Sequence, residues 1–106
     1  MSSYLIIGSY SSEGAKGVLK GGGTARANAV KAAIEGLGGD VQSFHFAFGS
    51  EDVYVVATLP DNVAAAAFGL AVAATGLVGV KTVVLLTPAE IDEAAKRQVT
   101  YSPPGK

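Results

Sequence analysis

The chain contains no cysteine and no tryptophan, and it has a single histidine among its 106 residues. The absence of cysteine excludes disulfides and thiolate metal ligands, although it does not fix the cellular compartment. One histidine, with no carboxylates at ligand spacing, predicts no metal site. There is no glycine-rich dinucleotide fingerprint and no Ser/His/Asp arrangement with supporting context, so we expect no bound cofactor.

Charge is also scarce, with 16% charged residues and a formal net charge of -1. This balance provides no basic surface for nucleic acid or for an acidic membrane, so neither is expected as a partner. Hydrophobic residues, by contrast, make up 49% of the chain. A chain of this length forms one domain, residues 1–106, and so much apolar surface suggests that a second copy covers part of it.

Residues 62–80 are uncharged over about the length that spans a bilayer. They are mostly alanine and glycine, with few of the large side chains that drive insertion, so we predict a soluble helix followed by a strand. The first four residues lack the basic start of a secretory signal. The expected location is therefore the cytoplasm.

The centre of the sequence is residues 41–59, where two apolar runs, 44–48 and 53–57, flank a short connection containing Gly49. Two β-rich runs around such a connection predict an antiparallel hairpin. Its acidic tip is Glu51-Asp52, and it carries the only histidine, His45.

The remaining elements follow from periodicity and capping residues. We predict strands at 4–10 and 80–86, a helical turn from about 11 to 20, helices from Thr24 to about Leu37, from 63 to about 75 and from Thr87 to about Gln98, and an extended arm at 99–106. The helix from residue 63 has no polar face, so it requires cover on both sides.

Right-handed crossovers place strands one and three in the middle of the sheet, with strands two and four at its edges. The expected fold is therefore α+β and ferredoxin-like: a βαββαβ four-stranded antiparallel sheet with both helices on one face, plus a C-terminal helix. The other face would be bare but would still carry aromatic or aliphatic residues from every strand. Two such faces stacked together would form a dimeric α+β barrel enclosing a pocket.

The sequence resembles the GYD domain proteins along essentially its whole length. The matching segments, in order, are YLIIGSY at 4–10, GGGTAR at 21–26, LGG at 37–39, FAFG at 46–49, LPD at 59–61 and LTPAEID at 86–92. The resemblance implies a ferredoxin-like fold of the dimeric α+β barrel group, found in small prokaryotic proteins of mostly unassigned function. The family's Gly-Tyr-Asp signature is altered here, because Glu51 occupies the place of the tyrosine and the aspartate is kept as Asp52.

His45 and Asp52 are the candidate catalytic residues. His45 lies on the hairpin face opposite Phe44, Phe46 and Phe48. If that face lines the barrel, His45 is a general base or polar anchor; if the phenylalanines line it, His45 is a structural hydrogen-bonder. Asp52 either belongs to the solvated turn or points into the pocket mouth, where it pairs with His45 or a tyrosine.

The candidate substrate-binding residues are Tyr4, Tyr10, Tyr54 and Arg26. Tyrosine combines apolar bulk with a hydroxyl, which suits a pocket wall, an interface or a core. Arg26 lies in the first turn of a helix, whose amino terminus attracts anions, but the glycines before it are explained by helix caps alone.

Two classes of function follow. The first is a homo-oligomeric small-molecule-binding domain or cofactor-independent enzyme, which binds a small apolar or aromatic metabolite in the cleft between sheet faces. The second is a non-catalytic assembly module or an effector-binding regulatory module. Both classes predict that the chain associates with itself.

Overall fold

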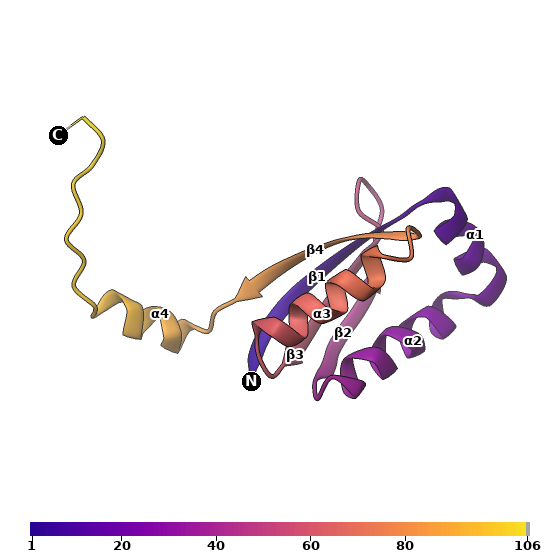
Figure 1. Ribbon diagram of the computed structural model, residues 1–106, viewed down its shortest axis with the longest axis horizontal. Helices are drawn as coiled ribbons and strands as arrows, with labels where there is room; N and C mark the ends of the chain where they lie inside the picture. The colour runs from indigo at the N-terminus through magenta and orange to yellow at the C-terminus, as the bar shows by residue number, and fades with distance from the viewer. Residues whose placement is uncertain (106) are drawn as a thin grey trace.

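The computed structural model describes residues 1–105, so Lys106, the last residue of the predicted arm, lies outside the described residues. A four-stranded sheet is accompanied by four helices (Figure 1). In chain order the elements are β1 (Ser2–Tyr10), α1 (Ser12–Gly21), α2 (Gly23–Gly36), β2 (Asp40–Phe46), β3 (Val53–Leu59), α3 (Asn62–Ala73), β4 (Val78–Leu85) and α4 (Pro88–Ala95).

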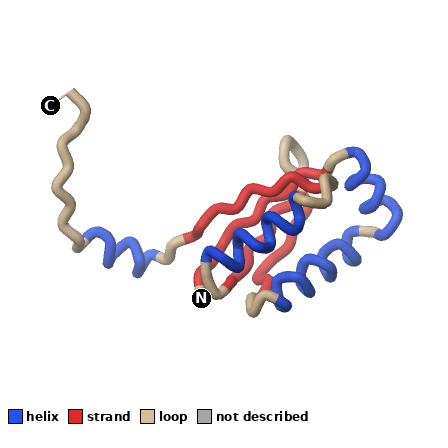
Figure 2. The backbone as a smooth tube through the Cα atoms, viewed as in Figure 1, coloured by secondary structure: helices blue, strands red, loops and turns tan. Residues whose placement is uncertain are grey.

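The sheet is open and antiparallel, with the strand order β2-β3-β1-β4. The predicted placement of the first and third strands in the middle is confirmed. Helices α2 and α3 cover one face, and the arrangement is α+β and consistent with the ferredoxin-like fold (Figure 2). Over the described part of the chain, no helix covers the second face.

The core lies between this covered face and the two helices. Alternate residues of β1 and β3 point into it, and there they meet Ile34 of α2 and Phe68 of α3. Burying a side chain of this size contributes about 1.5–3 kcal/mol. The buried set is Tyr4, Ile6, Ile34, Val53, Val55, Ala57, Leu59, Ala65 and Phe68.

Polar side chains cap the amino termini of three helices. The Ser11 hydroxyl caps α1, the Asp61 carboxylate accepts from the Ala64 N–H at 2.9 Å at the start of α3, and Thr87 forms a capping box with Glu90 on α4. The prediction that Thr24 caps α2 is wrong. Helix α2 begins at Gly23, because Gly22, with φ +88°, both ends α1 and precedes α2.

The hairpin turn is longer than its sequence suggests. Strand β2 ends at Phe46, so Phe48 belongs to the turn and is fully exposed. The Ala47 N–H donates to the Asp52 carbonyl, and the Asp52 N–H donates to the Gly8 carbonyl of β1, both at 2.9 Å. Backbone hydrogen bonds therefore fix the turn within itself and to β1. Strand pairing stops at Phe46, so the last two residues of the apolar run 44–48 belong to the turn.

The C-terminal arm leaves the layered body after β4 (Figure 1). Helix α4 and the residues after it, to 105, are exposed. The radius of gyration is 16.9 Å, whereas a compact chain of this length has one of about 13 Å. Residues 99–105 of the predicted arm are therefore extended. The last helix begins at Pro88 as expected but ends at Ala95, before the expected end near Gln98. Among residues 1–105 no helix is long and apolar enough to cross a membrane.

Candidate functional site

The open face of the sheet is organised in cross-strand rows. One row runs from His45 on β2 through Tyr54 and Ile7 to Lys81 on β4. The next row on the same face is Ser43, Val56, Leu5 and Val83. Because side chains alternate along a strand, these two rows project together, away from α2 and α3. The face therefore has an apolar centre with polar groups toward its edges.

His45 is exposed on this face and is paired in register with Tyr54, whose side chain is 37% exposed. Phe44 and Phe46 lie on the other side, where their rings meet edge to face at 5.4 Å. Of the two placements left open by the sequence, His45 takes the uncovered face. One expectation is corrected: β2 brings no aromatic or aliphatic side chain to the open face. It contributes His45, Ser43 and Asp40, which pair with Tyr54, Val56 and Thr58, because its phenylalanines face the helices.

Glu51 forms a polar cluster at one corner of the open face. Its Oε1 lies 2.7 Å from the ammonium of Lys81, and its Oε2 accepts a hydrogen bond from the Ser9 hydroxyl. The hydrogen bond from Lys81, followed by that from Ser9, lowers the pKa of the Glu51 carboxyl. The same contact raises the pKa of Lys81. Both groups are therefore charged across the neutral range.

Asp52 has a different role from its neighbour. Its Oδ2 accepts a hydrogen bond from the backbone N–H of Tyr10 at 2.8 Å, which fastens the hairpin turn to the end of β1. Within residues 1–105 no hydrogen bond joins Asp52 to His45, so the suggested pair is not formed in the single chain. Glu51 and Asp52 are adjacent in sequence but contact different partners. Asp52 binds the backbone of β1, whereas Glu51 contacts Ser9 and Lys81 on the open face.

Tyr4 belongs to the core. Its side chain is 1% exposed, and its hydroxyl donates to Asn62 Oδ1 at 2.6 Å. The sequence allowed a pocket wall, an interface or a core for this residue, and the structure selects the core. Tyr4 therefore links β1 to the first turn of α3 and does not reach the open face.

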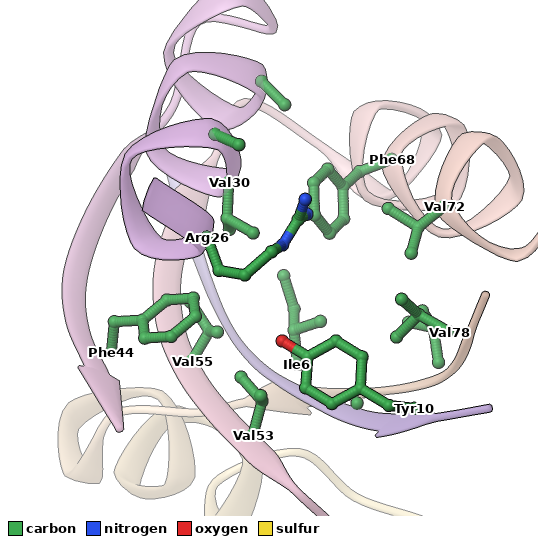
Figure 3. Close-up of a pocket in the computed structure, with 14 residues that line it drawn as sticks. Ile6, Tyr10, Arg26, Val30, Phe44, Val53, Val55, Phe68, Val72 and Val78 are labelled. Carbon is green, nitrogen blue, oxygen red and sulfur yellow. The ribbon is translucent and has the colours of Figure 1, made fainter. Parts of the chain in front are cut away.

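Tyr10 and Arg26 meet on the covered side of the sheet. They line a cavity of about 100 Å³ between α2, α3 and the strands (Figure 3). The other walls are apolar and include Phe44, Val53 and Phe68. Two of the predicted substrate-binding residues thus come together, but on the opposite side of the sheet from His45 and Tyr54.

Burial raises the pKa of the Tyr10 hydroxyl, while its interactions with the Arg26 guanidinium oppose this rise and the Asp52 charge adds to it. The phenol is therefore protonated at neutral pH and available as a hydrogen-bond donor. Arg26 is partly buried in the second turn of α2. The cavity thus has one hydroxyl and one cation among apolar walls.

Sequence reasoning did not single out Ser9 or Lys81. Strand alternation places Ser9 in phase with Ile7, but its contact with Glu51 depends on the pairing of β1 with β3. The contact of Lys81 with Glu51 depends on the β1–β4 register, in which Ile7 opposes Lys81. No local pattern encodes that register. Among residues 1–105 no group of three His, Cys, Asp or Glu side chains is arranged to hold a metal ion.

Comparison with protein families gives a match to the GYD domain over residues 4–95. This region runs from the third residue of β1 to the last residue of α4. No curated protein and no solved structure gives a significant match.

Proposed function

The chain belongs to the GYD domain family, and from this premise we propose that it is a homo-oligomeric small-molecule-binding domain with its site in a cleft between two open sheet faces. In this proposal two copies stack their sheets as a dimeric α+β barrel. The observation that supports it is the uncovered row of His45, Tyr54, Ile7 and Lys81 beside an apolar row.

A second copy suits this face for two reasons. Leu5, Val56 and Val83 form an apolar row across the face, and the burial of this row favours association. The corner charges of the face, Glu51 and Lys81, neutralise each other within one chain. Two such faces therefore approach without net repulsion, and stacked sheets lie about 10 Å apart.

The chemistry of the cleft follows from what projects into it. The aliphatic rows favour a small apolar or aromatic metabolite, and His45 and Tyr54 supply polar groups that orient it. His45 is also the group suited to act as a general base in a cofactor-independent reaction, because its imidazole can accept a proton from a bound ligand. An effector-binding regulator would use the same groups without turnover.

The test combines a thermal-shift screen of apolar and aromatic metabolites with sedimentation velocity on the wild type. We expect a dimer and at least one stabilising ligand, whose effect is lost in His45→Ala and reduced in Tyr54→Phe. Incubation with that ligand, followed by mass spectrometry, separates turnover from binding. A stable monomer, or ligand shifts unchanged in His45→Ala, would contradict the proposal. Lys31→Gln, exposed on α2, is the matched control.

A second candidate, a non-catalytic assembly module, is favoured by a different observation. Val63 and Leu70 on the outer side of α3 are 77% and 72% exposed. The extended arm carries exposed Ile91, Val99 and Tyr101. In this alternative the arm of one copy covers α3 of another. Deletion of residues 87–106 would then reduce the oligomer without lowering the stability of the body, whereas an unchanged oligomer would exclude it.

A further inference from the structure

The cavity on the covered side of the sheet is separate from the open face, and all its lining residues belong to one chain. It lies between α2, α3 and the inner side of all four strands (Figure 3). Alanines 29 and 33 of α2 face it, and their small side chains leave the gap that Val30 and Phe68 do not fill. A cavity of about 100 Å³ accommodates an apolar group of roughly the size of a benzene ring or smaller.

The polar groups of this cavity are concentrated in one pair. Among its fourteen lining residues, all within 1–105, Arg26 provides the only charge and Tyr10 the only hydroxyl. Figure 3 shows the Arg26 side chain reaching from α2 across the cavity, with its guanidinium end turned toward Phe68 and the Tyr10 hydroxyl directed into the same cavity. None of the three ion pairs within residues 1–105 involves Arg26.

A partly buried guanidinium without an acidic partner favours an anionic ligand. Its planar N–H donors match the two oxygens of a carboxylate. The acids that face the same region are already engaged: Asp52 accepts from the Tyr10 N–H, and Glu13 pairs with Lys16 at 3.1 Å. Neither of these two carboxylates forms an ion pair with Arg26.

The site is also open to solvent. The cavity adjoins a second hollow, of about 300 Å³, which shares Tyr10, Arg26 and Phe68 and is bounded on its outer side by Gly14 and Gly17 of α1. A Cβ built at Gly17 would have no atom within 4 Å. This glycine therefore leaves an unobstructed approach beside α1.

From these observations we propose that the helix-side cavity binds a small monocarboxylic acid with an aromatic or branched aliphatic body. The carboxylate lies between the Arg26 guanidinium and the Tyr10 hydroxyl, and the apolar body enters the space lined by Phe44, Val53 and Phe68. This site goes beyond the proposed function, because it lies on the other side of the sheet and requires no second copy.

The test is calorimetric titration of the full chain with benzoate and, separately, isovalerate. Saturable binding of one of the two is expected, with an affinity that falls by about tenfold to a hundredfold in Arg26→Gln. Tyr10→Phe should cause a smaller loss of affinity. Arg26→Lys should bind more tightly than Arg26→Gln but less tightly than the wild type, because an ammonium lacks the paired N–H donors with which a guanidinium binds both carboxylate oxygens. Lys31→Gln on the same helix is the matched control and should bind as the wild type does.

Three outcomes would overturn the proposal: no saturable binding of either acid, equal affinity in wild type and Arg26→Gln, or equal affinity for benzoate and uncharged benzyl alcohol. Ala33→Leu fills the cavity and should abolish binding, provided that its circular dichroism spectrum remains that of the wild type. If that variant does not fold, Arg26→Gln decides alone. The dimer-disrupting variant Val56→Lys should retain benzoate binding, which separates this site from the cleft between sheets.

Discussion

The carboxylate of Asp52 accepts a hydrogen bond from the backbone N–H of Tyr10 at 2.8 Å, so the hairpin turn is attached to the end of β1. This contact joins residues far apart in the sequence, and it crosses between the two strands that form the centre of the sheet. Asp52 is therefore a structural residue in the single chain, whatever further role an assembly gives it.

Replacement of Asp52 by alanine should lower the free energy of unfolding by about 1–3 kcal/mol, because the Tyr10 N–H loses a charged acceptor. Asp52→Asn retains an acceptor oxygen and should lose less. Urea unfolding followed by circular dichroism measures both changes. Asp92→Ala, exposed on α4, is the control and should change the free energy by less than about 0.5 kcal/mol. Equal values for Asp52→Ala and the control would show that the contact contributes nothing.

Tyr4→Phe removes only the hydroxyl that donates to Asn62 at 2.6 Å. We expect a loss of about 1 kcal/mol in the free energy of unfolding, since the ring keeps its place in the core. Tyr54→Phe is the matched change on the exposed face and should lose less than about 0.5 kcal/mol. The same urea experiment compares them. A larger loss for Tyr54 than for Tyr4 would contradict the assignment of Tyr4 to the core.

The Glu51–Lys81 contact predicts a pH dependence of stability. The pKa of Glu51 is lowered from 4.5, so its contribution is present above that value and is lost as the pH falls through the folded-state pKa. The pKa of Lys81 is raised from 10.5, so its contribution is present below that value and is lost as the pH rises through the folded-state pKa.

The measurement is an NMR titration of the Glu51 side-chain carboxyl, with a midpoint expected below 4.5. Lys81→Gln should move this midpoint upward, because the largest cause of the lowering is removed. Lys31→Gln, on the far side of the sheet, should leave it in place. A midpoint at or above 4.5 in the wild type would mean that the contact is absent in solution.

Val56→Lys and Leu70→Lys distinguish the two surfaces proposed for self-association. Val56 lies at the centre of the open sheet face, and Leu70 on the outer side of α3. A buried lysine without a partner disrupts an interface, so sedimentation velocity should show a monomer for Val56→Lys and a dimer for Leu70→Lys. The reverse pattern would move the interface to α3 and replace the shared cleft by the assembly proposal.

Two glycines of α1 should respond in opposite ways to alanine. A Cβ at Gly14 would lie 2.2 Å from the Leu77 carbonyl oxygen, whereas one at Gly17 would have no neighbour within 4 Å. Gly14→Ala should therefore destabilise the chain by about 1–3 kcal/mol. Gly17→Ala should stabilise it by about 0.4–1 kcal/mol, because alanine restricts the unfolded chain. Thermal unfolding measures both variants. Equal changes in melting temperature would contradict the close packing of Gly14 against Leu77.

Much of the fold is encoded locally. Alternation along β1 and β3 identified the strands, and Asp61 and Thr87 marked helix starts through their side-chain oxygens. The strand order followed from crossover handedness. Thr24 is a residue type that often caps helices, but here Gly22 is the N-cap and Thr24 lies inside the first turn of α2. Capping residues predict a helix start only when no earlier glycine provides one.

The site was less predictable because it depends on partners distant in sequence. Alternation placed His45 opposite its neighbouring phenylalanines but did not say which face the helices cover. The sequence suggests Tyr10 and Arg26 as binding residues for unrelated reasons, and only the packing of α2 over the sheet brings them into one cavity. Asp52 and not Glu51 is a candidate from the sequence, yet the register of β1 with β4 gives Glu51 the partner Lys81.

The central position of β1 also has a kinetic consequence. Its Ser3 pairs with Leu85, so the first strand to be synthesised cannot complete its ladder until nearly the whole body has been made. Pairing over such sequence separations requires costly loop closure and slows folding. On the ribosome, one edge of β1 must wait for β3 and the other for β4, and this interval is when the nascent chain depends most on protection from aggregation.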